Sequence, residues 1–207
     1  MPPPAANVPA IGVFQDFAGA SRAVLAWLRQ RFGFGLWMVT RVDRDDWIVL
    51  TAEDHHYGVT PGTVFRWADS FCSRMVRGQG PRVAPRAQDI AVYRQAPIAQ
   101  QVDIAAYVGL PLYRADGGLF GTLCAIDPAP QPDALADELP LLELLAGLLG
   151  AVLGMELARD AQSRLAEAAS VAAERDALTG AYNRRGWDAR LDQEDARCAR
   201  YGNPAAV

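Results

Sequence analysis

The sequence has no lysine, since all twenty of its basic residues are arginine. That absence excludes a P-loop lysine and a Schiff-base lysine within the chain. Histidine occurs only as the adjacent pair His55-His56, which excludes a helical HExxH zinc site. The three cysteines, Cys72, Cys124 and Cys198, are far apart and form no CxxC pair. This spacing fits a reducing compartment and argues against structural zinc or a disulfide framework. Most catalytic templates are therefore excluded, and we predict no metal site.

Net charge and hydropathy exclude further classes of partner. The net charge of -4 offers no basic surface for nucleic acid. No run approaches eighteen uninterrupted apolar residues, so we predict no membrane-spanning helix. The first residues are rich in proline and alanine and lack the basic and apolar regions of a signal peptide, so residues 1–10 are predicted to form a flexible tail. We expect a cytoplasmic protein that binds neither nucleic acid nor a membrane.

Hydrophobic periodicity predicts an α+β domain. Apolar residues at helical spacing indicate a helix over residues 14–32 and a short helix through 71–76. The connection over residues 81–104 contains three prolines and is predicted to be irregular, with a short helix near 98–102, as is typical of binding loops and lids. Runs bounded by turn residues indicate strands at 36–42, 47–51, 63–67, 105–113 and 119–126. This order favours an antiparallel sheet flanked by helices.

A long helical pattern follows over residues 133–175. The stripe Leu139, Leu142, Leu145, Leu149 and Val152 predicts that its first half packs against the sheet. Its second half is charged and keeps only a thin apolar seam, Leu157, Ala161, Leu165, Ala168 and Ala172. A long helix with a narrow seam and no core of its own favours a parallel two-stranded coiled coil, and so a homodimer through this helix. The alternative is a solvated helix stabilised by charge pairs four residues apart.

The segment from Asp176 to Trp187 reads as a helix stop followed by a new helix start. A charged last turn precedes Gly180, which can adopt positive φ, and an amphipathic pattern begins after it. Such a joint transmits the orientation of one helix to the next element. We expect it to be stabilised by a carboxylate–arginine pair or by a backbone cap.

Residues 34–128 resemble a GAF sensor domain, through Ser70-Phe71-Cys72, the run YVGLPL at 107–112 and the run GGLFGTLCAID at 117–127. The resemblance implies a GAF-like domain over residues 11–132, with a small-molecule pocket between the sheet and the 87–102 segment. The implied lining residues are Phe65, Trp67, Phe71, Cys72, Tyr107, Thr122 and Cys124. Such a pocket would be apolar with a few orienting polar groups. The alternative is a filled core in a domain that only dimerises, so an open cavity with convergent polar groups would favour sensing.

The cysteines and histidines leave further alternatives open. Cys72 and Cys124 could attach a bilin or sense redox state, or they could be small buried hydrophobes. Cys72 is followed by Ser73 rather than by the histidine that usually follows a chromophore cysteine. A cysteine-dependent reductase would need one of these thiols exposed with a low pKa. His55 and His56 are adjacent, so on a strand their side chains point to opposite faces and do not converge on one ion.

The joint itself resembles the opening motif of GGDEF diguanylate cyclases, through Asp176, Leu178-Thr179-Gly180, Asn183-Arg184-Arg185 and Trp187. Ala181 and Trp187 replace the usual leucine and phenylalanine. The resemblance implies that residues 133–175 are a signalling linker and that residues 176–207 begin a cyclase that uses Mg²⁺ and condenses two GTP into cyclic di-GMP. It places the metal-binding aspartate, the guanine-recognition residues and the signature loop downstream of Val207. We therefore expect a regulatory fragment with neither catalytic residues nor a cofactor of its own.

Overall fold

The computed structural model describes residues 14–176 and 178–202. The predicted tail over residues 1–10 lies outside the described residues, as do residues 203–207. The chain separates into two compact units, one that extends to Glu156 and one that begins at Leu157. The two units are therefore described one after the other.

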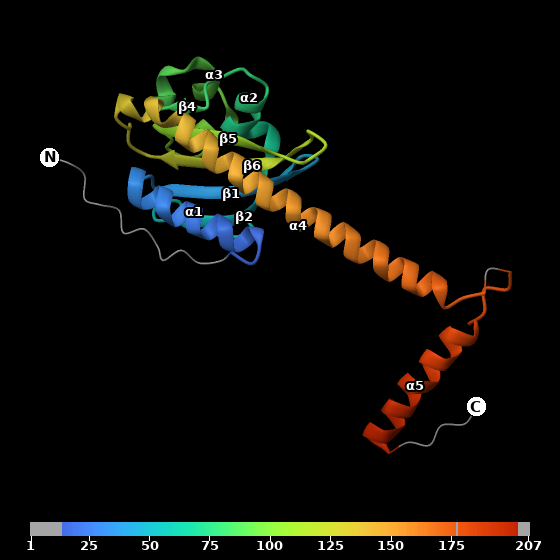
Figure 1. Cartoon of the computed structure of the whole chain (residues 1–207). Helices are drawn as coiled ribbons and strands as arrows, with labels where there is room; N and C mark the ends of the chain where they lie inside the picture. Colours follow the sequence, from blue (N-terminus) through green and yellow to red (C-terminus); the bar gives the residue numbers. More distant parts are fainter. Residues whose placement is uncertain (1–13, 177, 203–207) are drawn as a thin grey trace. The chain divides into compact units, whose positions relative to one another are not determined.

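The first unit is built on a six-stranded, wholly antiparallel sheet with the order β3-β2-β1-β6-β5-β4 (Figure 1). The strands are β1 (Leu36–Asp43), β2 (Asp46–Asp54), β3 (Val64–Arg66), β4 (Val83–Ala84), β5 (Ala106–Tyr113) and β6 (Leu119–Asp127). Antiparallel hairpins join β1 to β2 and β5 to β6. The predicted α+β class with an antiparallel sheet is confirmed.

Helices cover both faces of this sheet, so the side chains on both sides of its strands are buried. Trp37 and Val39 of β1 point into the core beneath α1 (Phe17–Phe32) and α4 (Leu139–Ala173). Leu36 and Met38 alternate with them and point into a second core. That second core is covered by α2 (Phe71–Val76), α3 (Ala91–Arg94) and the short 3-10 turns around them (Figure 1). The described part of the first unit therefore has two hydrophobic cores, on opposite faces of one sheet.

The first half of α4 is part of the first core. Leu142, Ala146, Leu149 and Leu153 are buried there, and the predicted stripe members Leu139, Leu145 and Val152 pack beside them. Glu156 of the same helix accepts a hydrogen bond from the free N–H of Phe17 at the start of α1. The sequence placed the boundary between domain and linker at residue 132, whereas the packed part of the helix continues to Leu153.

The connection over residues 81–104 is more ordered than the sequence predicts. It holds β4, the 3-10 turns η2 (Ala87–Asp89) and η3 (Pro97–Gln100), and α3 between them. Tyr93 of α3 is fully buried, and its hydroxyl donates to the carbonyl of Pro81. This side chain fixes the segment over the second core, which explains how so short a helix is maintained.

The helical stretch Asp133–Ala173 is long and apolar enough to cross a membrane when judged by length and composition alone. Its mean hydropathy is 1.9 over the most apolar window, of which 22% is buried in the structure. Glu143 and Glu156 interrupt the stretch, so no long uninterrupted apolar run is visible in the sequence. Core helices of soluble proteins meet the same criterion, which makes this weak evidence for a membrane.

The second unit contains the remainder of α4, a tight joint over residues 174–183, and α5 (Arg184–Tyr201). Arg175 and Tyr182 form an isolated antiparallel bridge that closes the joint. Asn183 caps the start of α5, and Gly202 ends it in the left-handed conformation with φ 68°. The predicted helix stop and restart is therefore present.

Candidate ligand-binding site

A cavity of about 230 Å³ lies in the second core, on the face of the sheet away from α1 and α4. Its floor is formed by alternate residues of three neighbouring strands: Leu36, Met38, Tyr107, Cys124 and Ile126. Met38 lies directly opposite Cys124, and Leu36 opposite Ile126, in the β1–β6 pairing. Because side chains two residues apart on a strand share one face, the register itself brings these groups together.

Aromatic rings form the walls of this cavity. Trp47 of β2 packs against Phe65 of β3 with ring centroids 5.8 Å apart. Phe71 of α2 meets Tyr107 edge to face at 5.5 Å. The indole N–H of Trp47 donates to the hydroxyl of Thr40 at 2.8 Å, which fixes the orientation of the ring. The wall is therefore rigid and its own polar group is already satisfied.

The mouth of the cavity is shaped by the loop after β2. Asp54 accepts hydrogen bonds from the backbone N–H groups of His56 and Tyr57 at 2.9 Å each, and from that of Val59. Partial burial acts to raise the pKa of Asp54, but these backbone hydrogen bonds outweigh it and lower the pKa below its usual value. Tyr57 and Val59 both line the cavity. A single ionised carboxylate therefore holds one rim in place.

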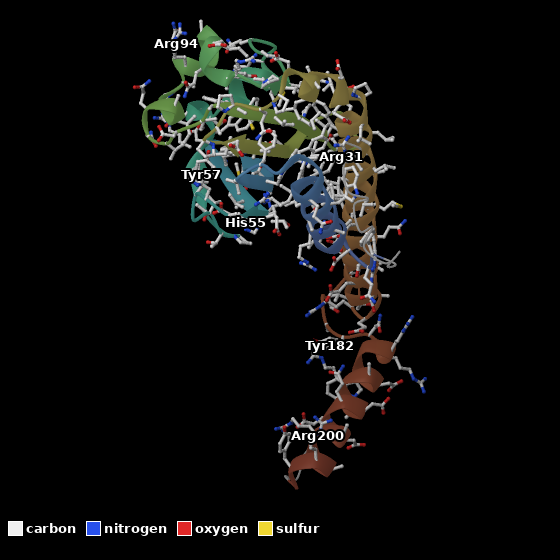
Figure 2. All side chains as sticks on the ribbon, turned by 90° about the vertical axis from the view of Figure 1, so that its left-hand side faces the viewer. Arg31, His55, Tyr57, Arg94, Tyr182 and Arg200 are labelled. Carbon is white, nitrogen blue, oxygen red and sulfur yellow. The ribbon has the colours of Figure 1, made fainter. Side chains whose placement is uncertain are left out.

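The side chain of Tyr57 extends from this loop across the mouth of the cavity. Its hydroxyl donates to the backbone carbonyl of Asp103 at 2.8 Å, which links the β2 loop to the segment before β5. The side chain lies on the side of the sheet away from α1 and α4 (Figure 2). Burial raises the pKa of Tyr57, and the negative charges of Asp127, Asp103 and Asp54 raise it further. The hydroxyl is therefore a permanent donor at an acidic rim.

The side chains of Tyr107, Cys72 and Cys124 form a cluster where the cavity meets the sheet. The Tyr107 hydroxyl donates to Cys72 Sγ at 3.3 Å, and the Thr122 hydroxyl lies 3.7 Å from Cys124 Sγ. Burial raises the pKa of Cys124 well above its usual value. Burial acts in the same direction on Cys72, but hydrogen bonds from Cys124 and Tyr107 outweigh it and lower the pKa of that thiol. Both cysteines are 1% exposed, so neither is the solvent-exposed thiol that a reductase would need.

Five of the seven lining residues implied by the GAF resemblance do surround this cavity: Phe65, Phe71, Cys72, Tyr107 and Cys124. Trp67 does not, because β3 ends at Arg66 and Trp67 begins the 3-10 turn η1 (Trp67–Asp69), where strand alternation no longer applies. Its ring packs on Trp47 at 6.2 Å. Thr122 does not line the cavity either, because its hydroxyl is paired with that of Thr40 at 2.8 Å behind the wall.

The sequence missed the mouth and much of the floor. Alternation in β1 already indicated that Leu36 and Met38 share a face, so this part of the lining was available from the strand pattern. Tyr57 and Val59 lie in the loop after β2, for which no periodic signal exists, whereas Ile98 and Val102 belong to the 87–102 segment that the resemblance placed over the pocket. The histidines do not converge, as expected: His55 pairs with Glu53 at 2.9 Å, whereas His56 packs on the ring of Tyr57. Within the described residues, no cluster of three or more acidic, histidine or cysteine side chains could hold a metal ion.

The joint after α4 is organised by two polar side chains. Asp176 Oδ1 accepts hydrogen bonds from the backbone N–H groups of Leu178 and Thr179 and from the Thr179 hydroxyl, at 2.9–3.1 Å. These hydrogen bonds lower the pKa of Asp176. The turn then passes through Gly180 in the left-handed conformation with φ 70°, which only glycine adopts without strain. The carboxylate therefore stabilises the turn as a backbone cap.

Asn183 serves both helices at once. Its side-chain amide donates to the carbonyl of Ala173, the last residue of α4, at 2.7 Å. Its side-chain oxygen accepts from the N–H of Gly186 in the first turn of α5 at 3.0 Å. Tyr182 lies where the two helices meet (Figure 2), between the guanidinium groups of Arg175 and Arg190 at 4.9 and 5.1 Å. Asn183 thus pairs with one free carbonyl at the end of α4 and with one free N–H at the start of α5.

The remaining predicted joint residues have other surroundings. Arg184 and Arg185 are exposed, and within the described part of the joint neither pairs with Asp176. The sequence predicted either a carboxylate–arginine pair or a backbone cap at this joint, and the described residues contain the backbone cap. Leu178 is 95% exposed, so it packs against nothing in this unit.

Comparison with known proteins identifies the fold. The GAF domain profile matches residues 13–153. The GAF domain of a phosphoenolpyruvate-protein phosphotransferase from Acinetobacter superposes with a TM-score of 0.56 at 12% identity, and the match covers 72% of this chain and 87% of that one. Among curated proteins, no sequence matches the chain.

Two further solved structures share the fold. A free methionine-R-sulfoxide reductase from Neisseria meningitidis, solved with its substrate, gives a TM-score of 0.53 at 20% identity over 70% of this chain and 80% of that one. The photosensory core module of a phytochrome from Stigmatella aurantiaca gives 0.59 at 16% identity over 77% of this chain, which corresponds to 37% of the phytochrome chain. The chain belongs to the GAF domain family, the sensor domains of phytochromes and other signalling proteins.

Proposed function

We propose that this chain is the regulatory and dimerisation part of a diguanylate cyclase, and that a small molecule in the GAF cavity controls cyclase output through α4. The chain would supply no catalysis itself. GTP and Mg²⁺ would be bound by the cyclase domain that the joint introduces. We place the protein in the cytoplasm, where GTP is available.

The observation that carries this proposal is the joint. Three of the residues that match the GGDEF opening motif have defined structural roles: Asp176 caps the turn, Gly180 adopts positive φ, and Asn183 links the end of α4 to the start of α5. Because the Asn183 side chain forms hydrogen bonds with both α4 and α5, the joint resists rotation of one helix independently of the other. This is the property that a coupling element between a sensor helix and an output domain requires.

The open cavity supports ligand sensing over the alternative of a pure scaffold. A domain that only dimerises would gain stability from filling its second core, since an unfilled cavity costs free energy. Here about 230 Å³ remains open between aromatic walls, with a tyrosine hydroxyl at its sheet end. Such a space is the usual setting for a small-molecule site.

The outer face of α4 supports a homodimer. Leu144, Leu148 and Met155 are 59%, 56% and 66% exposed, in a helix whose opposite side is buried. With Ala151 they follow the alternating spacing of four and three residues that defines a coiled-coil seam. The same spacing reaches Leu165 and Ala172 of the predicted seam. A second copy in parallel orientation would cover this face and place two cyclase domains side by side, as condensation of two GTP requires.

The dimer is tested by light-scattering mass at high micromolar concentration. We expect a dimer for the unaltered chain and a monomer for Leu148→Glu, because a carboxylate at the seam cannot be buried unpaired. Ala166→Glu is the matched control, since Ala166 is exposed and lies off this seam. A monomeric unaltered chain, or equal masses for both variants, would contradict the dimer.

Coupling is tested in a chimaera that carries this chain up to Trp187 in front of a complete diguanylate cyclase domain, joined at the shared motif. Removing seven residues, 162–168, keeps the seam facing the partner, whereas removing two, 162–163, rotates the following helix by about 200°. We expect cyclic di-GMP formation to survive the first deletion and to change at least about fivefold with the second. Equal activity of both deletions would show that α4 is a passive tether.

A further inference from the structure

The cavity is lined without a single charged side chain in the described part of the chain. Negative charge lies at the rim, where Asp127, Asp103 and Asp54 all act on the Tyr57 hydroxyl. An anionic ligand would approach this acidic rim unfavourably and would find no arginine inside. A cationic ligand would find no carboxylate inside either, and an unpaired buried charge is strongly unfavourable. The lining therefore favours a neutral ligand.

The volume of the cavity sets the size of that ligand. An engineered cavity of about 150 Å³ lined by apolar side chains binds benzene. The present cavity of about 230 Å³ is therefore about one and a half times as large. It is smaller than the roughly 300 Å³ at which pockets for drug-sized ligands begin. One ring with a substituent, or two fused rings, fits this space.

The aromatic walls favour an aromatic ligand over an aliphatic ligand of equal size. Trp47 and Phe65 line one side, and Phe71 and Tyr107 line the other. Both wall pairs have ring centroids 5.5–5.8 Å apart, within the range of favourable edge and offset contacts. A planar aromatic ligand between them would make the same contacts with each wall.

Among the fully buried hydroxyl groups of the lining, one lacks a good partner. The Tyr57 hydroxyl donates to Asp103, and the Ser70 hydroxyl donates to the Trp67 carbonyl and accepts from Ser73. The Tyr107 hydroxyl donates only to the sulfur of Cys72, which is a weak acceptor. Burial raises the pKa of Tyr107, so this hydroxyl remains a donor. An oxygen or ring nitrogen of a ligand would be a better acceptor for it.

We propose that the cavity binds a compact, uncharged aromatic molecule of one or two fused rings, with one hydrogen-bond acceptor directed at the Tyr107 hydroxyl. This assignment rests on the proposed sensing function, because it names the class of ligand for the same site.

Matched probes of nearly equal size test each part of the class on the full chain at pH 7 by isothermal titration. Benzyl alcohol is neutral, benzoate is an anion, benzylammonium is a cation, and cyclohexylmethanol lacks the aromatic ring. We expect benzyl alcohol to bind at least about tenfold more tightly than either ion, because the ions must be buried unpaired. Cyclohexylmethanol should bind at least threefold more weakly than benzyl alcohol, and Tyr107→Phe should weaken benzyl alcohol but not toluene.

Two variants show whether binding is in the cavity. Val102→Trp fills the space from its lid side and should abolish binding, whereas Gln101→Trp adds the same ring at an exposed neighbouring position and should leave binding unchanged. If benzoate or benzylammonium binds as tightly as benzyl alcohol and Val102→Trp still abolishes it, the proposed class is overturned while ligand sensing stands. If no probe binds and the Val102→Trp chimaera has unaltered cyclase activity, both are overturned.

Discussion

Gly109 determines where the side chain of Tyr107 can lie, and this position gives a quantitative test of the cavity. A methyl group added at Gly109 would overlap the Tyr107 hydroxyl and ring end, and would lie 3.2 Å from Met75 Cε. The ring of Tyr107 is fully buried between Phe71 and Tyr93, at 5.5 and 5.0 Å. It therefore has no space to move except into the cavity or out of its packed position.

We expect Gly109→Ala to cost about 1–3 kcal/mol, the usual penalty for overpacking a core. For a chain of this size, each kcal/mol lowers the melting temperature by about 2–4 °C, so the expected decrease is about 2–12 °C. Thermal unfolding followed by circular dichroism measures it. Binding of benzyl alcohol should weaken in the same variant, because the displaced ring enters the cavity or loses its hydroxyl position.

A double-mutant cycle with Tyr107→Leu isolates the cause. Leucine lacks the ring end that the new methyl group would overlap, so Gly109→Ala should cost clearly less in that background. If Gly109→Ala costs the same in both backgrounds, the penalty comes from the backbone. If it costs less than about 0.5 kcal/mol in the unaltered chain, Tyr107 does not lie over Gly109 as described.

Three further perturbations have defined outcomes. The pKa of Asp54 is lowered in the folded state, so the stability that its hydrogen bonds contribute is present above the unfolded value of 3.8 and is lost as pH falls below it through the folded value. The protection factors of the Tyr57 and Val59 amides against hydrogen exchange, measured relative to the intrinsic rate at each pH, should therefore fall below about pH 4. Unchanged protection factors would contradict this. Tyr57→Phe removes the hydrogen bond to Asp103, which is worth about 0.5–1.5 kcal/mol. The dissociation rate of a bound probe, measured by stopped flow, should therefore rise by roughly two- to tenfold. Tyr113→Phe, at the exposed end of β5, is the control. Asn183→Ala should destabilise α5 by about 1–2 kcal/mol, because it removes the cap of α5 and the bonds to the end of α4 together. Asn183→Asp should retain the cap of α5 and lose only the bonds to the carbonyls of Ala173 and Arg175. Equal amide exchange in α5 for both variants would show that the double cap is unimportant.

The fold could largely be predicted because its signals are periodic. Alternation in β1 separates Met38 from Val39 without any knowledge of the partners. The stripe through Leu142 and Leu149 likewise indicates which side of α4 is buried. Each of these features repeats along the chain, so it is visible from the sequence alone.

The rest depends on contacts between residues far apart in sequence. The strand β4 has two residues and exists because Val83 pairs with Val108 across the sheet. The mouth of the cavity depends on the hydrogen bond from the Tyr57 hydroxyl to the Asp103 carbonyl. It also depends on the Asp54 carboxylate, which accepts hydrogen bonds from backbone N–H groups of its own loop. Single interactions of this kind leave no periodic trace, so the sequence located part of the floor of the site but not the rim at Tyr57 and Val59.

The two cores lie on opposite faces of one sheet, so the cavity and α4 share no direct contact route within the sensor domain. Met38 lines the cavity, whereas the next residue, Val39, packs in the core beneath α4. A ligand that displaces Met38 must therefore tilt the strand backbone to reach the helix. Because packed cores resist compression and transmit strain, a displacement of the strand on one face would be felt on the other. If the proposed sensing function is correct, the central strands β1 and β6 would carry this displacement from the cavity to α4.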